Sequence, residues 1–221
     1  MQKSAIRISP FVVERLTRYL IFMQLGGQRG KEWISSDTIA KAMGLTSSTV
    51  RQDISHLPTP CGISKKGYDV KRLAAALTDV LGIETVKQAV IVGAGNFGKA
   101  LFLHEEFLEQ GLRIAALFDN DPGLIGIMVG GARIRDVAEL DGYAEKNGVD
   151  IGIIAVPAEA AQHVADQLVA AGVKGILNLS TCDVRPTGGV PVVHSRLILD
   201  ILNLSFKMKY NQVNGKTFAV T

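Results

Sequence analysis

Residues 89–98 read Ala89-Val90-Ile91-Val92-Gly93-Ala94-Gly95-Asn96-Phe97-Gly98, so that a short apolar run leads directly into a G-x-G-x-x-G pattern. The apolar run is typical of a buried parallel strand, and a helix is predicted from Lys99 to Glu109. In this order the first glycine makes a tight turn, the second lets a diphosphate approach the backbone, and the third lets the helix pack on the strand. The segment therefore predicts a dinucleotide-binding α/β fold, with the diphosphate at a helix N-terminus.

A carboxylate follows at the position where such a fold binds a ribose. The next predicted strand, Arg113 to Phe118, ends in Asp119, which lies 21 residues after Gly98. A carboxylate at this strand end accepts hydrogen bonds from a ribose diol. Asn120-Asp121 follow where a binder of the 2′-phosphate would favour arginine, so we expect NAD(H) rather than NADP(H).

Strands and helices continue to alternate beyond this point. The pattern predicts a helix capped by Asp136 and running to Lys146, a strand at 151–156, a helix at 159–171 and a strand at 174–179. Residues 81–194 are therefore expected to form a doubly wound parallel sheet of the Rossmann type. The predicted cofactor contacts are Gly93, Ala94, Gly95, Asn96, Phe97, Gly98, Asp119, Val156 and Pro157.

The charge is distributed unevenly along the chain. Residues 1–80 hold twelve Lys and Arg against six Asp and Glu, a net charge of +6, whereas residues 81–221 have a net charge of −3. A basic N-terminal domain of this kind favours a polyanion such as DNA as its partner.

Two short helices in the basic part suggest how DNA would be bound. Ser36 is the expected cap of a helix from Asp37 to Met43, and Thr46 that of a second helix from Ser47 to Leu57, with Gly44-Leu45 between them. This is a helix-turn-helix pattern, and residues 62–70 read as a β-hairpin wing. A helical bundle that binds nothing is the alternative. The predicted DNA contacts are Ser47, Ser48, Thr49, Arg51 and Gln52 of the second helix and Lys65 and Lys66 of the wing.

The C-terminal part contains a helix that is apolar on almost every side. It is predicted from Ser195 to Lys209, and its domain is taken as residues 195–210, with a flexible tail at 211–221. Such a helix requires burial on more than one side, so a partner subunit is the expected host. Packing against its own sheet is the alternative.

Other classes of protein are disfavoured by composition. No uncharged apolar run approaches the roughly 18 residues of a membrane span, and charged residues near the N-terminus argue against a signal peptide, so a cytoplasmic location is expected. The two cysteines and four histidines show no metal-binding spacing. No catalytic constellation is found, and we do not expect an enzyme.

The combined motifs resemble the Rex family of bacterial redox-sensing transcriptional repressors, over nearly the whole chain. The resemblance is carried by Ile34-Ser35-Ser36, Thr49-Val50-Arg51-Gln52-Asp53, Gly67-Tyr68-Asp69-Val70, the glycine-rich turn, residues 118–122, residues 156–162 and Gly175-Ile176-Leu177-Asn178. It implies a homodimer that exchanges C-terminal helices, binds palindromic operator DNA when free or bound to NAD+, and is released by NADH. Two segments depart from the family pattern, Leu57-Pro58-Thr59-Pro60-Cys61 and Leu179-Ser180-Thr181-Cys182.

A physical basis for redox sensing follows from the charge of the cofactor. NAD+ carries a cationic ring and NADH a neutral one, so a closed apolar pocket near Phe97 and Val156-Pro157 would favour NADH. Two alternatives stay open. One is a DNA-binding regulator that senses another nucleotide ligand such as coenzyme A, and the other is a small NAD-dependent oxidoreductase with a fused helical domain.

Overall fold

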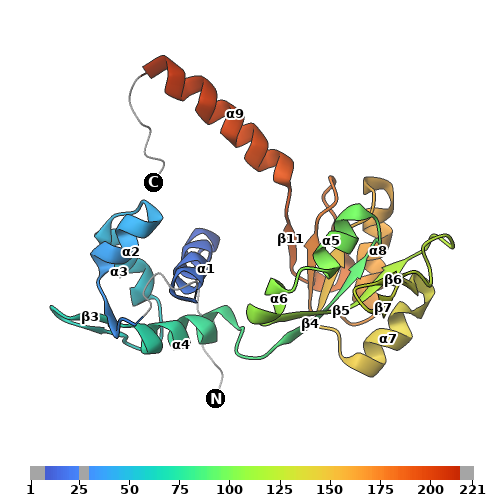
Figure 1. Ribbon diagram of the computed structural model, residues 1–221, viewed down its shortest axis with the longest axis horizontal. Coiled ribbons are helices and arrows are strands. Elements are labelled where there is room, and N and C mark those ends of the chain that lie inside the picture. The colour runs from blue at the N-terminus through green and yellow to red at the C-terminus, as the bar shows by residue number, and fades with distance from the viewer. Residues whose placement is uncertain (1–7, 25–29, 215–221) are drawn as a thin grey trace. The chain divides into compact units, whose positions relative to one another are not determined.

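The computed structural model describes residues 8–24 and 30–214, with side chains to residue 210 (Figure 1). The chain divides into two compact units between Glu84 and Thr85. This division lies four residues after the boundary expected at residue 80. The difference arises from α4 (Val70–Leu81), a helix that the sequence interpretation did not include. Asp69 caps its first turn and Gly82, with φ 67°, ends it, so the helix belongs entirely to the N-terminal unit.

The N-terminal unit is a winged helix-turn-helix. Its helices and strands are α1 (Pro10–Gln24), β1 (Trp33–Ile34), α2 (Ser36–Met43), α3 (Ser47–Ser55), β2 (Gly62–Ile63), β3 (Gly67–Asp69) and α4. The three short strands form one antiparallel sheet in the order β1-β3-β2. The predicted hairpin is β2–β3, and β1 extends it by one strand. One apolar cluster joins the helices, with Leu16, Tyr19, Ile39, Val50 and Leu73 fully buried.

The caps of the two motif helices differ in one detail from the sequence prediction. Ser35, and not Ser36, caps α2, because its hydroxyl accepts the N–H of Thr38 at 3.1 Å. Ser36 is already the first helical residue. Thr46 caps α3 as predicted, accepting the N–H of Thr49 at 3.1 Å, but α3 ends at Ser55 rather than Leu57. Gly44, with φ 69°, ends α2 and makes the turn between them.

The C-terminal unit contains a six-stranded parallel sheet. Its strands are β4 (Lys87–Val92), β5 (Leu112–Asp119), β8 (Arg135–Asp136), β9 (Ile151–Ile154), β10 (Gly175–Asn178) and β11 (Val192–His194). Their spatial order is β8-β5-β4-β9-β10-β11. Numbered along the chain, this is 3-2-1-4-5-6, the order of the Rossmann fold, whose strand order reverses between β4 and β9. Ligands of such sheets bind at the carboxyl ends of the strands beside that reversal.

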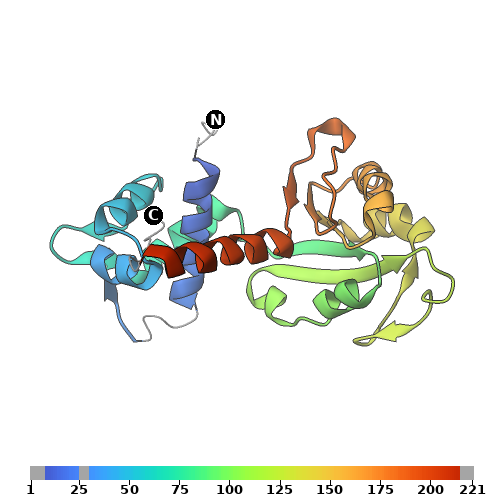
Figure 2. The same ribbon diagram turned by 90° about the horizontal axis from the view of Figure 1, so that it is seen from above.

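Alternate residues of β4 face two different helical layers. Val90 and Val92 belong to the apolar cluster with α7 (Leu140–Asn147) and α8 (Ala158–Ala170), whereas Ala89 and Ile91 contact the side of α5 (Asn96–Phe102). Figure 2 shows these helices on opposite faces of the sheet. The central strand is therefore buried on both faces, which explains its uninterrupted apolar run.

Several elements of this unit differ from the predicted ones. The helix expected from Lys99 to Glu109 is two helices, α5 and α6 (Glu106–Glu109), and the chain between them includes His104. The helix expected from Asp136 begins as a 3₁₀ turn, Val137–Glu139, before α7. Strands β8 and β11 were not predicted, nor was the hairpin of β6 (Met128–Val129) and β7 (Ala132–Arg133).

The C-terminal helix α9 spans Leu197–Asn214. It begins two residues later than predicted and continues beyond residue 210, so the first residues of the expected tail, 211–214, are helical. Residues 215–221 of that tail lie outside the described residues. Each side chain of α9 from Leu197 to Tyr210 is exposed in the single chain. Within the described part of the chain, no helix is both long and apolar enough to cross a membrane.

Candidate functional site

The recognition helix α3 presents polar side chains on the side opposite to its buried face. Val50 and Ile54 are buried, whereas Ser48, Arg51 and Gln52 are exposed. Ser47 and Thr49 are engaged locally: the Ser47 hydroxyl donates to Asp37, and the Thr49 hydroxyl lies 2.8 Å from that of Thr46. The side chains most available to a base edge or phosphate are therefore Ser48, Arg51 and Gln52.

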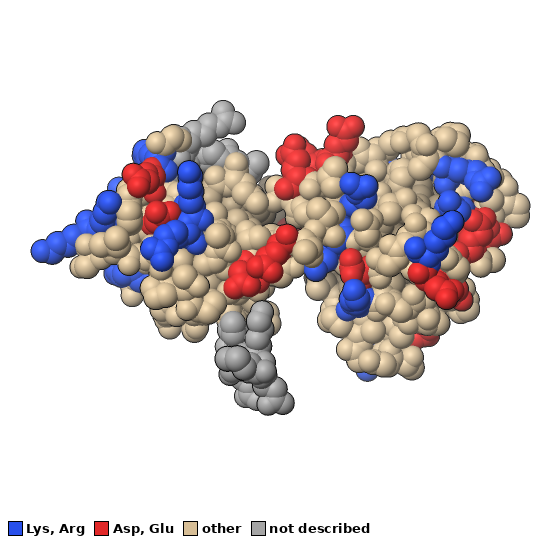
Figure 3. Space-filling view, turned by 90° about the horizontal axis from the view of Figure 1, so that it is seen from below, with Lys and Arg blue, Asp and Glu red and all other residues tan. Residues whose placement is uncertain are grey.

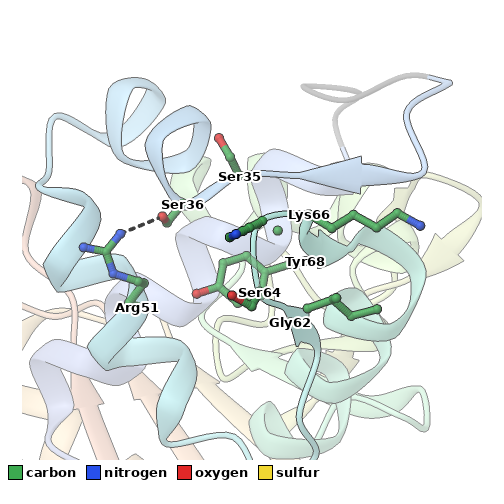
Figure 4. A pocket seen from close by; sticks show the side chains of 10 residues that line it. Ser35, Ser36, Arg51, Gly62, Ser64, Lys66 and Tyr68 are labelled. Atoms are coloured by element: carbon green, nitrogen blue, oxygen red, sulfur yellow. Dashed lines mark hydrogen bonds between the residues drawn. The ribbon is translucent and has the colours of Figure 1, made fainter.

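A cleft of about 460 Å³ separates this helix from the wing. The Nη1 of Arg51 donates to the Ser36 hydroxyl at 3.1 Å, and Figure 4 shows this pair on one side with Tyr68 and Ser64 opposite. The aromatic ring of Tyr68 is half-buried, and burial raises the pKa of its hydroxyl. The cleft combines hydroxyl donors with positive charge, as a phosphate-binding surface requires.

The two wing lysines differ in how they are held. Lys65 is in the left-handed conformation, with φ 65°, at the tip of the turn. The Lys66 ammonium lies 3.7 Å from the centre of the Trp33 ring, a cation–π contact that fixes it over the half-buried indole. In Figure 3 a group of Lys and Arg side chains projects at the left edge, where Figure 1 places this hairpin.

One acidic residue of the recognition helix is buried, and its role in packing was not predicted from the sequence. Asp53 is 1% exposed and accepts two hydrogen bonds from the Arg15 guanidinium and one from the Tyr19 hydroxyl, each at 2.7 Å. The hydrogen bond to Asp53 raises the pKa of Arg15. The pKa of Tyr19 is raised mainly by burial and secondly by its hydrogen bond to Asp53. This cluster fixes α3 against α1. Its sequence signal is only an acidic residue three positions after Val50, on the buried side.

The glycine-rich turn after β4 has the crowding that its sequence predicts. Gly93 has φ 110°, and a Cβ there would lie 2.4 Å from the carbonyl oxygen of Ala155. A Cβ on Gly98 would lie 1.9 Å from the carbonyl oxygen of Gly93. At Gly95 the same atom would meet nothing within 4 Å, and Gly95 precedes the first turn of α5. Backbone there is open to a bound group, so these residues fit a dinucleotide diphosphate at the helix N-terminus.

Asp119 lies at the end of β5, beside this turn. Its Oδ2 accepts the N–H of Ala94 at 2.6 Å, and its Oδ1 accepts the N–H of Asp121 at 2.9 Å. The carboxylate therefore orients the glycine-rich turn, a role that the sequence interpretation did not give it. Each carboxylate oxygen can accept more than one hydrogen bond, so the predicted contact with a ribose diol is compatible with this geometry.

A cavity of about 320 Å³ extends from the glycine-rich turn past Asp119 to α8. Of the predicted cofactor contacts, it is lined by Gly93, Gly95, Asp119, Val156 and Pro157. It is also lined by His163 and Gln167 of α8, which the sequence did not indicate as site residues. Ala94, Asn96, Phe97 and Gly98 do not line it. Phe97 is 57% exposed, so the closed apolar pocket expected around it is not formed by one chain alone.

The atypical segment after β10 is held by internal hydrogen bonds. The fully buried Asn178 donates from Nδ2 to the Cys182 carbonyl at 2.7 Å, and its Oδ1 accepts the N–H and hydroxyl of Ser180. The Cys182 thiol donates to the Ala158 carbonyl at 3.3 Å. These polar groups therefore shape the turn at the sheet's ligand-binding edge. Among the residues that the structure describes, no three His, Cys, Asp or Glu side chains are placed to hold a metal ion.

Comparison with known proteins connects the two sites to one family. A family model described as "Putative DNA-binding protein N-terminus" matches residues 7–55, and one described as "CoA binding domain" matches residues 84–182. The "Redox-sensing transcriptional repressor Rex 1" of Thermotoga maritima is 36% identical over 205 residues, which cover 92% of this chain and 97% of that protein. The chain belongs to the Rex family. A Rex repressor of Caldicellulosiruptor bescii is 37% identical over 91% of this chain and 92% of its own.

Solved Rex-family structures have the same fold over nearly the full length. A crystal structure of RSP in complex with beta-NAD+ and operator DNA matches with a TM-score of 0.85 and 30% identity, covering 97% of this chain and all of that one. RSP in complex with beta-NADH matches with a TM-score of 0.83 and 29% identity, covering 96% and 98%. The winged helix-turn-helix and Rossmann assignments from sequence are thereby confirmed.

Proposed function

We propose that this chain is a redox-sensing transcriptional repressor that binds palindromic operator DNA as a homodimer and is released when NADH replaces NAD+. The observation that carries the proposal is the presence, in one Rex-family chain, of a winged helix-turn-helix and a glycine-rich cradle with room for a diphosphate at Gly95. Relatives that match more than 90% of this chain are repressors by name, so we propose no catalytic role. A cytoplasmic location follows, because operator DNA and the NAD(H) pool are found together there.

The proposed DNA contacts are the exposed side chains of the cleft and wing. Arg51 and Gln52 would read base edges in the major groove, where α3 enters with its N-terminal half. Ser48 and the wing lysines Lys65 and Lys66 would contact phosphates or the minor groove. Ser47 and Thr49 would then act mainly by fixing the first turn of α3, since their hydroxyls are already engaged.

The proposed cofactor contacts have separate tasks. The backbone around Gly95 would receive the diphosphate, and Asp119 would hold both a ribose diol and the turn itself. The bound dinucleotide supplies a ring whose charge changes with its redox state. An apolar surface including Phe97, Val156 and Pro157 would disfavour the cationic form, and because Phe97 is exposed in one chain, we expect a second subunit to complete that enclosure.

Helix α9 is the proposed element of dimerisation. Its apolar side chains are all exposed in the single chain, including Leu199, Leu202 and Phe206, which favours burial in a partner over packing on its own sheet. A dimer with two arrangements, of which one matches half-sites about 34–36 Å apart, would let the cofactor control DNA binding.

The test is operator binding at fixed total cofactor with a varied NADH:NAD+ ratio. In gel shifts, the protein should bind members of a palindromic operator library and release them as the NADH share rises. Equal DNA affinity at both extremes would refute the redox interpretation. Coenzyme A is a rival ligand because a CoA-binding family model matches this chain. Competition between NADH and coenzyme A for the protein distinguishes the two ligands. Turnover of NADH with candidate substrates, together with no specific retention of DNA, would indicate the oxidoreductase instead.

A further inference from the structure

Two polar side chains of α8 line the cofactor cavity, that of His163 exposed and that of Gln167 half-buried. His163 and Gln167 are four residues apart, so they lie on the same face of the helix, one turn from each other. No hydrogen bond from either side chain to another group is found within the described part of the chain. The neighbouring Gln162 differs, because its Oε1 accepts the N–H of Arg185 at 2.9 Å and its Nε2 donates to Asp166 and to the Arg185 carbonyl. The amide of Gln162 is thus engaged in the fold, whereas that of Gln167 is available to a ligand.

The place of this pair in the cavity indicates which part of a dinucleotide it would meet. Asp119, at the end of the second strand of the sheet, marks the ribose that carries the adenine. The cavity continues from there to α8, with apolar walls that include Leu124, Val137 and Val164. A flat, mostly apolar group with a polar edge fits such walls, and adenine is the part of the dinucleotide attached to that ribose.

We propose that Gln167 and His163 read the adenine base of the dinucleotide. A glutamine amide matches adenine with two hydrogen bonds, because its oxygen accepts from the 6-amino group while its nitrogen donates to N7. His163 supplies an aromatic ring on which the base stacks, a contact that does not depend on the group at position 6. The inference rests on the proposed function and adds to it the residues that select the base.

The roles of the two residues can be separated with one analogue, reduced nicotinamide hypoxanthine dinucleotide, in which an oxygen replaces the 6-amino group. That oxygen faces the amide oxygen of Gln167 unfavourably, so the unmodified protein should bind NADH roughly tenfold more tightly than the analogue. Gln167→Leu should lose most of this preference. His163→Ala should weaken both ligands by a similar factor, roughly tenfold, and keep the preference. Gln162→Leu is the matched control, because it removes a glutamine amide from the same helix without changing the cavity, and it should keep both affinities.

Dissociation constants measured by calorimetry for these four proteins decide the proposal, with thermal unfolding confirming that each variant is folded. The unmodified preference retained in Gln167→Leu, or no preference in the unmodified protein, would overturn the base-reading role. A loss of preference in His163→Ala equal to that in Gln167→Leu would overturn the division between them. If NADH failed to bind the unmodified protein, the proposed function itself would fall, which is a result distinct from NADH binding without selection of its base.

Discussion

Asp53 fixes the recognition helix through three hydrogen bonds to two residues of α1. In Asp53→Ala, the Arg15 guanidinium and the buried Tyr19 hydroxyl lose their acceptor, and removal of one member of a buried ion pair costs about 3 kcal/mol. We expect urea unfolding monitored by circular dichroism to show this loss in the N-terminal unit. DNA binding should fall with it, because α3 is no longer held.

The control for this variant is an acidic residue on the surface of the same unit. Asp79 is exposed on α4, so Asp79→Asn should change the unfolding free energy by less than about 0.5 kcal/mol. Equal destabilisation in the two variants would show that the Asp53 cluster has no special role in stability.

The glycines of the turn after β4 give a second pair of matched changes. Gly98→Ala places a methyl group against the Gly93 carbonyl, so it should destabilise the C-terminal unit. Gly95→Ala meets open space, and its φ of −67° suits alanine, so the melting temperature should stay almost constant. The same methyl stands where a diphosphate would approach, and NADH affinity, followed by fluorescence, should fall at least about tenfold. Unchanged affinity in Gly95→Ala would place the diphosphate elsewhere.

Asp150 connects β4 to the residue that precedes β10, and it gives a pH dependence with a definite sign. Its Oδ1 accepts a hydrogen bond from the Lys174 ammonium at 2.7 Å, and its Oδ2 accepts one from the N–H of Gln88 at 3.0 Å. Both hydrogen bonds lower the pKa of the carboxyl, and the one from Lys174 has the larger effect. Because the pKa of Asp150 is lower in the folded state than in the unfolded state, its carboxylate stabilises the folded protein at pH values above the unfolded-state pKa of about 3.9. This contribution to the free energy of unfolding is lost as the pH falls through the folded-state pKa. Asp150→Asn should therefore cost about 1 kcal/mol at pH 7, and the difference from the unmodified protein should shrink below pH 4 in urea unfolding.

At the scale of helices and strands, local signals explain what the sequence predicted. Thr46 and Gly44 mark helix ends by a side-chain acceptor and a left-handed φ, and both act as predicted. The run Ala89–Val92 is buried on both faces, so its apolar pattern was unambiguous. The carboxylate and glycines of the cofactor cradle follow from the same local rules.

The features that were not predicted depend on contacts between distant residues. Strand β8 has only two residues and exists because Arg135 and Asp136 pair with the end of β5. Likewise, β11 is defined by its pairing with β10. His163 is exposed on α8, as its helical context predicted, but only the folded sheet brings it beside the loop after β5. The role of Asp53 required the position of α1.

The wing can be tested as an element by removing one charge while keeping its turn. Lys65 has φ 65°, which glycine adopts without a steric penalty, so Lys65→Gly should leave the hairpin intact. If the ammonium contacts a phosphate, operator affinity should fall for all sequences alike and the slope of log K against log salt should decrease by about one. Fluorescence anisotropy over a salt series measures both. Lys146→Ala, an exposed lysine of α7, is the control, and the same slope in both variants would exclude a phosphate contact by Lys65.

At the scale of the whole molecule, the two units divide the charge as they divide the proposed ligands. The net charge of +6 in residues 1–80 coincides with the winged helix-turn-helix, and Arg51, Lys65 and Lys66 surround or flank its cleft. The net charge of −3 in the remainder accompanies the sheet and its cavity, which Asp119 and Asp121 both line where we propose that the ribose binds. A phosphate on the ribose 2′ position would be repelled there, which is consistent with NAD(H) as the proposed ligand.

Helix α9 carries a large unburied apolar surface in the single chain, because eight large apolar side chains between Leu197 and Met208 are exposed. If a second copy covers them, Leu199→Lys combined with Leu202→Lys should place unpaired charges in that interface and convert a dimer into a monomer, as measured by sedimentation velocity. Lys207→Gln, a change at a polar position of the same helix, should stay dimeric. The monomer should keep its fold and lose most of its affinity for a palindromic operator, since one winged helix reaches one half-site only. A double variant that remains dimeric and binds the operator normally would move the subunit interface away from α9.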